Sequence, residues 1–468
     1  MDHVLRTDLG GRAPLDRGEC VAALVHLSDL HVVDPVSPAR AEWIELRALD
    51  PRWKPLLHMH RPQEAMAHWA LAAHVAALAA APVAPWSGAR YDLVLSTGDN
   101  IDNGQFNELD AYLAIVLGGR TRLSAAGGPH DPSGAALGSP WPFWAPEPGV
   151  ADTWKAQGYP AVPDFLARVG AEVISPGLGV PFASLPGNHD VMRQGTAFSP
   201  PALEALAVGA AKSLRPPPGF EPADPLSLYV DRPDLFSLGV TYAITPDAGR
   251  RLVDRVGWIE RHAAAGVRGY GPSSALTPSG DTVVDLEHVR LVLLDTNHPE
   301  GDYQGSIGLD QLAWLDARLG EVGDGRVTLV ASHHGTDTLV NTRGDRADRV
   351  LAAAFHAVVQ RHPRVLAWLV GHRHIHRVAA RVGPYGGHWE ITTGSVIDWP
   401  SQGRAVEVVR HADGSFELVC TMLDHGAPAG SLAALHREVA HRFAGPALAA
   451  MIEGAPTDRD VRLVCPLR

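Results

Sequence analysis

Residues 181–190 read PFASLPGNHD, and this stretch combines two features that recur along the chain. Its first half, residues 181–185, is a short apolar run bounded by proline, which is typical of a buried β-strand. Its second half, residues 187–190, supplies an asparagine, a histidine and an aspartate. Polar side chains directly after a buried strand predict a ligand site at the carboxyl edge of a sheet.

Four further apolar runs show the same pairing of a strand pattern with a polar end. They cover residues 21–27, 91–95, 327–331 and 365–370, and they are followed by SDLH (28–31), GDN (98–100), HHG (333–335) and GHRH (371–374). A sixth run, residues 289–294, precedes Asp295. Helical patterns separate the runs, at residues 62–81, 107–117, 309–319 and 347–360. This alternation predicts an α/β fold, and taken alone it indicates a single open sheet covered by helices.

Two segments interrupt the alternation, residues 118–180 and 191–286. Both are rich in glycine and proline and have few periodic stretches, which is typical of insertions within a domain. We therefore expect one domain over residues 15–430, in which the two insertions form a lid or cap over one edge of the sheet. Residues 431–468 are expected to pack on that domain as a C-terminal helix and tail.

The composition is that of an acidic folded protein. The chain has 468 residues, of which 46% are hydrophobic and 20% charged, and 40 basic against 52 acidic side chains give a net charge of −12. This balance argues against a protein that coats nucleic acid or an anionic membrane surface.

The cysteines and the apolar stretches indicate a cytoplasmic protein with no membrane association. Cys20, Cys420 and Cys465 form no CxxC pair, so we expect neither a disulfide framework nor a thiolate zinc site. Residues 1–11 lack the basic start and apolar stretch of a signal peptide. The most apolar long stretch, residues 65–81, is mostly alanine and carries two histidines, unlike a membrane-spanning helix.

The polar ends of the five runs have the composition of a metal site. The chain contains 24 histidines, and imidazole is the commonest metal ligand. Seven candidate ligands follow the strands: Asp29, His31, Asp99, Asn188, His333, His372 and His374. A single ion would leave several of them unpaired, whereas two ions that share Asp99 have four ligands each. Such donors suit Mn, Fe or Zn, and two adjacent ions can acidify a water and clamp a phosphate ester.

In their order along the chain, the motifs DxH (29–31), GD (98–99), GNHD (187–190), H (333) and GHxH (371–374) resemble those of the calcineurin-like metallophosphoesterases. The resemblance extends from Ser28 to His374, and the two insertions match no pattern. It implies a two-sheet β-sandwich flanked by helices, with the metal site at the C-terminal ends of strands. It also implies a phosphatase or phosphodiesterase in which a metal-bridging hydroxide attacks the phosphate ester.

The resemblance further assigns the ligands to two ions. One set is Asp29, His31, Asp99 and His374, and the other is Asp99, Asn188, His333 and His372. Of the adjacent residues His333 and His334, the first is favoured because the family's ligand is usually the first of such a pair.

The resemblance gives the GNHD motif a catalytic role. His189 is implied as proton donor to the leaving group or as a phosphate contact, with Asp190 orienting its ring, which fits the need for an acid of near-neutral pKa beside the leaving oxygen. Purple acid phosphatases carry a tyrosine where this chain has Asp102, so we expect a colourless protein.

Several neighbouring polar residues have two interpretations each. Asn297 and His298 follow the sixth run and Arg193 follows GNHD, so all three are candidate substrate contacts, although a polar loop or a salt bridge explains them equally well. Tyr303 and Gln304 lie further along the loop after the sixth run and are candidates to line the substrate pocket, with an ordinary polar loop as the equal alternative. Asp102 and Asn103 either orient metal ligands or cap the next helix.

The sequence thus predicts a phosphoesterase with two metal ions and a small phosphomonoester or phosphodiester as substrate. A nuclease is less favoured, because the chain is acidic and has no basic stretch with interleaved aromatic residues. A non-catalytic, protein-binding scaffold of the same fold is the second alternative. Such scaffolds tend to lose ligands, whereas this chain keeps all of them.

Overall fold

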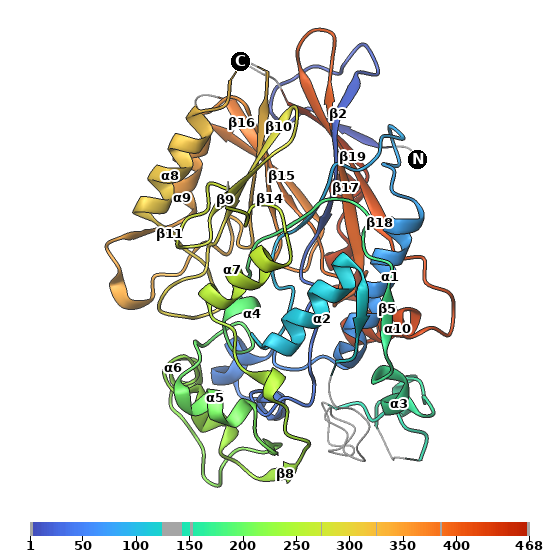
Figure 1. Ribbon diagram of the computed structural model, residues 1–468, viewed down its shortest axis with the longest axis vertical. Helices are drawn as coiled ribbons and strands as arrows, with labels where there is room; N and C mark the ends of the chain where they lie inside the picture. Colours follow the sequence, from blue (N-terminus) through green and yellow to red (C-terminus); the bar gives the residue numbers. More distant parts are fainter. Residues whose placement is uncertain are drawn as a thin grey trace.

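The computed structural model describes residues 3–123, 143–149, 153–272, 274–323, 325–383 and 386–465. Two β-sheets pack face to face and helices cover their outer faces (Figure 1). The first sheet consists, in spatial order, of β1 (Val4–Arg6), β19 (Val461–Cys465), β18 (Phe416–Asp424), β17 (Gln402–Arg410), β2 (Glu19–Leu27), β3 (Leu93–Ser96) and β6 (Phe182–Ser184). The second consists of β15 (Arg377–Gly383), β16 (Gly386–Thr392), β14 (Val365–Val370), β12 (Val327–Ser332), β10 (Val289–Leu294) and β9 (Thr282–Asp285).

This architecture confirms the α/β class and the two-sheet sandwich, and it shows that the single open sheet indicated by alternation alone is wrong. All six apolar runs are strands, and β10 and β14 have the predicted bounds. The runs are continuously apolar because both faces of these strands are buried. In β2, for example, Leu24 faces the other sheet, whereas Ala23 and Val25 face the helices.

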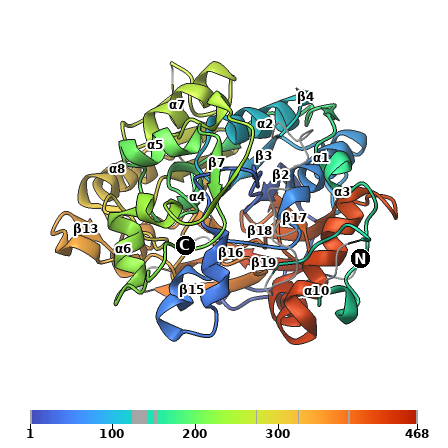
Figure 2. The same cartoon turned by 90° about the horizontal axis from the view of Figure 1, so that it is seen from below.

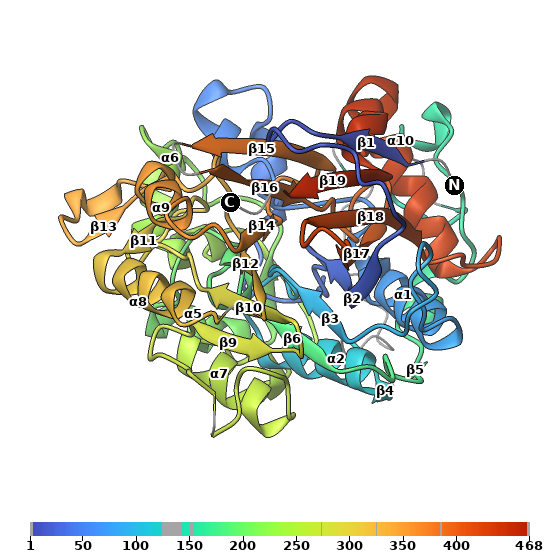
Figure 3. The same cartoon turned by 90° about the horizontal axis from the view of Figure 1, so that it is seen from above.

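The helices predicted between the strands form the outer layers. Helices α1 (Ala67–Ala80) and α2 (Phe106–Leu117) pack on the first sheet, and α8 (Leu309–Gly320) and α9 (Ala352–Val359) pack on the second (Figure 3). Helix α10 (Leu432–Glu453) lies against α1. Among the described residues, no helix has both the length and the apolar character needed to cross a bilayer.

Strand β17 was missed by the sequence analysis although it lies between β2 and β18. Two fully buried charged residues, Arg404 and Glu407, interrupt its apolar pattern. Arg404 donates to the backbone carbonyls of Asp458 and Arg459, and Glu407 accepts from the backbone amides of Trp86 and Ser87. Because distant backbone groups satisfy both charges, no local pattern identifies the strand.

The two insertions lie on opposite sides of the lower end of the molecule (Figures 1 and 2). The described part of the first contains β4 (Gly119–Thr121), α3 (Phe165–Val169) and β5 (Val173–Ser175); residues 124–142 and 150–152 lie outside the described residues. The second contains α5 (Pro201–Ala207), β7 (Ala211–Ser213), α6 (Pro225–Asp231), β8 (Thr241–Ala243) and α7 (Arg255–Ala264). Shorter elements are α4 (Asn188–Val191), β11 (Ile307–Gly308) and β13 (Arg349–Val350).

The second insertion packs against residues 32–66, which we call the arm. The arm follows β2 and contains three 3-10 helices, Glu42–Arg47, Pro51–Leu56 and Glu64–Met66. Trp43 and Trp53 of the arm pack with Tyr229 and Phe236 of the insertion, and all four side chains are buried. Lys212 of the insertion is also buried and pairs with Glu42 of the arm at 2.5 Å. The insertion therefore stabilises the arm from outside.

Candidate metal centre

The loops after β2, β3, β6, β12 and β14 converge at one end of the sandwich, as their sequences predict. The amide of Asp29 donates to Gly98 O at 3.0 Å, and that of His31 donates to Asp99 O at 2.9 Å. The amide of Gly371 donates to His333 O at 3.0 Å. These bonds join loops that lie 38 to 69 residues apart in the sequence.

Five of the seven candidate ligands have a left-handed backbone, which is rare for residues other than glycine. Their φ angles are 53° at Asp29, 44° at His31, 51° at Asp99, 66° at His372 and 53° at His374. Strained backbone of this kind clusters at functional sites, where the surrounding structure holds it. The fold therefore keeps these side chains in place at a cost in backbone energy.

Ligand atoms of the first candidate set lie close together. Those of Asp29, His31 and His374 are all within 4.8 Å of one another, and His374 Nε2 lies 3.1 Å from Asp29 Oδ1. His31 Nε2 is 3.7 Å from Asp99 Oδ2 and has no hydrogen-bond partner among the described residues, although it is buried. A buried nitrogen without a partner is costly, and a metal ion would satisfy it.

The second candidate set also meets at Asp99. His333 Nε2 is 3.1 Å from Asp99 Oδ2 and 3.2 Å from His372 Nδ1. Asn188 donates through Nδ2 to Gly195 O at 3.0 Å, and its Oδ1 is buried without a described partner. The unpartnered oxygen and the facing ring nitrogens are the donors that a second ion needs.

Hydrogen bonds on the far side of the rings fix the tautomers. His31 Nδ1 donates to Asp102 Oδ1 at 2.9 Å, His333 Nδ1 to Thr97 O at 2.8 Å, and His374 Nδ1 to Asp398 Oδ2 at 2.7 Å. Because each of these acceptors can only accept, the Nε2 atom of each ring can carry the free lone pair that a metal requires. The residues present therefore fit a pair of transition-metal ions.

The geometry favours His333 over His334 as a ligand. His334 Nε2 donates to Tyr303 O at 3.1 Å, and its Nδ1 lies 2.8 Å from Thr296 Oγ1. Both ring nitrogens of His334 thus have protein partners, whereas His333 Nε2 faces Asp99 and His372. His334 holds the chain at Tyr303 instead.

The carboxylates of the site attract positive charge. Burial acts to lower the pKa of His333, but the Asp99 and Asp29 carboxylates outweigh it and raise that pKa to about 9. The pKa of His374 shifts in the same way. Burial acts to lower it, but the Asp29 and Asp398 carboxylates raise it to about 9. A bound cation supplies the positive charge that these carboxylates otherwise draw from protons.

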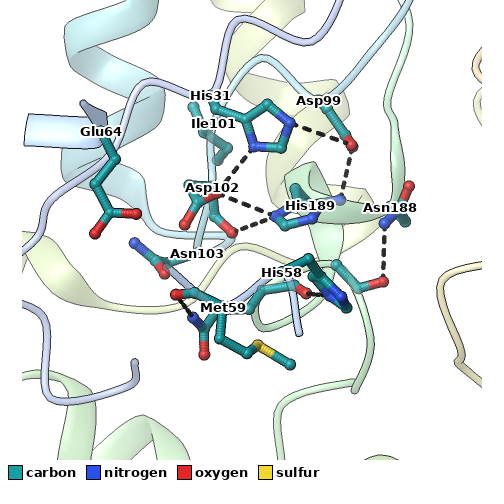
Figure 4. A network of polar contacts seen from close by, with 12 residues as sticks. His31, His58, Met59, Glu64, Asp99, Ile101, Asp102, Asn103, Asn188 and His189 are labelled. Atoms are coloured by element: carbon teal, nitrogen blue, oxygen red, sulfur yellow. Dashed lines mark hydrogen bonds and ion pairs between the residues drawn. The ribbon is translucent and has the colours of Figure 1, made fainter. Parts of the chain in front are cut away.

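Asp102, not Asp190, orients the ring of His189. His189 Nδ1 lies 2.9 Å from Asp102 O and 3.3 Å from Asp102 Oδ1 (Figure 4). The expected contact between Asp190 and this ring does not occur, because the Asp190 carboxylate accepts from the amides of Gly187, Asn100 and Ile101. Asp190 therefore ties the GNHD loop to the GDN loop.

The contacts of Asp102 decide between the two interpretations given for it. Its carboxylate bonds to His31 and is paired with the buried Arg40. It therefore orients ligands and does not cap a helix. Burial acts to raise the pKa of Asp102, but Arg40 and the hydrogen bonds from His189 and His31 hold it well below its usual range. Asn103 instead bonds to Glu108 on α2 and to Arg40.

None of the three predicted substrate contacts lines the cavity over this centre. Arg193 is fully buried, and its guanidinium donates to Pro233 O and Ser237 Oγ. Asn297 Nδ2 donates to Gly187 O at 3.1 Å, behind the GNHD loop. His298 Nδ1 accepts from the amide of Glu300 at 3.1 Å. All three hold loops in place, so the expectation of substrate contact does not agree with their positions.

The cavity has a volume of about 300 Å³, and its floor includes Asp99, Asn188, His189, His372 and His374. Two residues of its wall, Tyr303 and Gln304, were candidates in the sequence analysis, whereas His58, Arg61, Arg373 and Asp398 were missed. Asp398 follows β16 by six residues, so the strand-end signal was present there. His58 and Arg61 lie in the arm, where no strand-end signal exists.

The cavity lining includes no described residue of either insertion. The second insertion reaches the site indirectly, because Gln194 accepts from the Ala41 amide through Oε1 and donates to Met59 O through Nε2. The lid or cap stays a prediction, as do the domain bounds.

The structure thus brings Asp, Asn and His donors together at the strand ends of a helix-flanked sandwich. The family model for calcineurin-like phosphoesterases matches residues 22–376. The chain therefore belongs to the calcineurin-like phosphoesterase family, as its motifs predict.

Proteins similar to this chain include a probable phosphodiesterase and a dimetal phosphatase. A probable cyclic nucleotide phosphodiesterase from Synechococcus sp. is 34% identical over 95 residues, which cover 20% of this chain and 36% of that protein. The match thus spans about a third of that relative. The solved structure of a dimetal phosphatase from Danio rerio aligns with 87% of this chain and 97% of its own, at 14% identity and a TM-score of 0.38. A structural similarity this low supports no inference about the site of this chain.

Proposed function

We propose that this protein hydrolyses a small phosphomonoester or phosphodiester with two metal ions held by Asp29, His31, Asp99, Asn188, His333, His372 and His374. The observation that carries the proposal is a pair of buried atoms without a described partner, His31 Nε2 in one candidate set and Asn188 Oδ1 in the other. When bound, such ions supply a hydroxide nucleophile, shared between them, at neutral pH and neutralise phosphate charge. The nitrogen and oxygen donors suit Mn, Fe or Zn.

His189 is proposed as the acid that protonates the leaving oxygen. Its Nδ1 is bound to Asp102, so its Nε2 is left to hold a proton toward the substrate. The Asp102 carboxylate, kept anionic by Arg40, stabilises the charged ring. An acid so positioned contributes about 10²–10⁴-fold in rate.

The cavity volume supports a small substrate. About 300 Å³ lies at the lower end of the range for small-molecule sites. The net charge of −12 still argues against a nuclease. Cyclic nucleotides are a diester class to include in tests, because the matched segment of a relative comes from a probable cyclic nucleotide phosphodiesterase. The three free cysteines, two of them buried, support a reducing and thus cytoplasmic compartment.

The test is hydrolysis of p-nitrophenyl phosphate, bis-p-nitrophenyl phosphate and a cyclic nucleotide by the full chain after metal removal and reconstitution with Mn²⁺. We expect turnover that depends on the metal and is lost in Asn188→Ala, with Asn188→Asp retaining part of it because a carboxylate can still bind the ion. The rates on the three substrates decide between monoester and diester. Unchanged turnover in Asn188→Ala contradicts the proposal, and a stable protein complex with no bound metal revives the scaffold alternative.

A further inference from the structure

Arg61 brings a positive charge from the arm to the wall of the cavity. Its side chain is 12% exposed. The Arg61 amide donates to Glu64 Oε2 at 2.9 Å, and its Nε donates to Asp398 Oδ2 at 3.3 Å. Arg61 is thus anchored at its backbone and at the base of its guanidinium.

The terminal nitrogens of Arg61 remain available. Neither forms a hydrogen bond to any residue that the structure describes, and Nη1 is 4.0 Å from Asp102 Oδ1. They are not sealed in the protein interior either, because Arg61 lines the cavity. A guanidinium held by its Nε with its terminal N–H groups free is prepared for an anionic oxygen.

Arg61 lies between the two carboxylates that orient the first set of ligands. Asp398 binds His374, and Asp102 binds both His31 and His189. A phosphate group held over the metal centre, with His189 beside its leaving oxygen, would therefore lie next to Arg61. Arg373 also lines the cavity but is exposed, so solvent and salt screen its charge more strongly.

We propose that Arg61 contacts the substrate and binds the additional non-bridging phosphoryl oxygen that a phosphomonoester has and a diester lacks. This inference rests on the proposed function and deepens it, because it makes the site selective for monoester dianions. A monoester presents one more charged oxygen than a diester, and the planar fork of arginine matches such oxygens.

The alternative role for Arg61 is to position His374 through Asp398. Metal content separates the two roles. Loss of a substrate contact leaves both ions bound, whereas loss of a positioning residue weakens the binding of an ion, as we expect for Asp398→Asn.

The experiment compares Arg61→Gln, Arg61→Lys and Arg373→Gln with the control Arg52→Gln in the Mn-loaded full chain. Arg52 belongs to the same arm, is 45% exposed and pairs with Asp50, and it does not line the cavity. The readouts are binding of inorganic phosphate by calorimetry, bound metal per chain, and KM for p-nitrophenyl and bis-p-nitrophenyl phosphate. Thermal melting checks the fold, and Arg61→Lys keeps the charge if Arg61→Gln is too unstable.

For Arg61→Gln we expect phosphate affinity to fall, and KM for the monoester to rise, roughly ten- to hundredfold. The diester should change less than about threefold, with two ions retained. Arg61→Lys should lie between Arg61→Gln and the unmodified chain, and Arg52→Gln should match the latter. Unchanged phosphate affinity, equal losses for both esters, or loss of an ion overturns the inference. If the unmodified chain hydrolyses neither ester, the proposed function fails, but phosphate binding still decides whether Arg61 is an anion contact.

Discussion

The floor and the wall of the cavity are built in different ways. Each floor residue lies a few positions after a strand, so its place follows from the strand and the loop motif. The wall residues His58 and Arg61 lie on the arm, and the arm depends on contacts with Trp43, Phe236 and other residues far away in the sequence. Local sequence therefore positions the candidate metal ligands, whereas tertiary packing positions the wall and so determines which molecules reach the site.

The adjacent residues His333 and His334 test this division most strongly. His333→Ala removes a candidate metal ligand that directly follows a strand, and we expect it to lose one ion and at least about 10³-fold in kcat, more than the 10–100-fold typical of an orienting partner. His334→Ala removes the support of Tyr303 in the wall, so it should keep both ions and mainly change KM. Metal analysis and steady-state kinetics on both variants check this. Loss of metal only in His334→Ala would reverse the ligand assignment.

His189 gives the next largest expected effect. His189→Ala should retain both ions, because this residue belongs to neither ligand set. With an alkyl phosphate, whose leaving oxygen needs a proton, we expect kcat to fall about 10²–10³-fold. With p-nitrophenyl phosphate, whose leaving group is stable as an anion, the fall should be smaller. Equal losses on both substrates would assign His189 to phosphate binding and not to proton donation.

The limits of the sequence analysis follow the same division between floor and wall. The five strand-end motifs predicted the seven candidate ligands and the position of the site, and the family resemblance of those motifs implied the sandwich. Strand β17 was missed because Arg404 and Glu407 are buried against distant backbone groups. Arg193 resembled a phosphate contact because it follows GNHD, yet its partners, Pro233 O and Ser237 Oγ, lie 40 or more residues further on. Such partners come together only in the folded chain, so no local sequence pattern indicates them.

Gly195 connects the second insertion to the floor. Its φ is +67°, its carbonyl accepts from Asn188, and an added Cβ would collide with Asn188 Nδ2 and the ring of His189. We expect Gly195→Ala to reduce kcat roughly 10- to 100-fold, because small displacements of reacting groups are costly. Gly179→Ala is the matched control, since Gly179 has φ +62° and no atom within 4 Å of the added Cβ. An equal loss of kcat in the two variants would show that backbone strain, and not the collision with Asn188 and His189, causes the loss.

The smallest effect on activity is expected from the packing behind the wall. Phe236→Ala opens the aromatic cluster that holds the arm, and truncation of a buried phenylalanine costs about 3–5 kcal/mol of folding free energy. We expect a lower denaturation midpoint, a KM raised a few-fold and an unchanged metal content. A variant that loses an ion while folded would show that the floor depends on the arm after all.

The central claim is that two ions at one shared centre are needed for phosphate ester hydrolysis. The most direct measurement titrates the metal-free chain with Mn²⁺ and follows p-nitrophenyl phosphate and bis-p-nitrophenyl phosphate hydrolysis together with bound metal. We expect little activity with one ion bound per chain and a rise to full activity as the second ion binds. Full activity with one ion, or activity without metal, would show that hydrolysis does not need two ions.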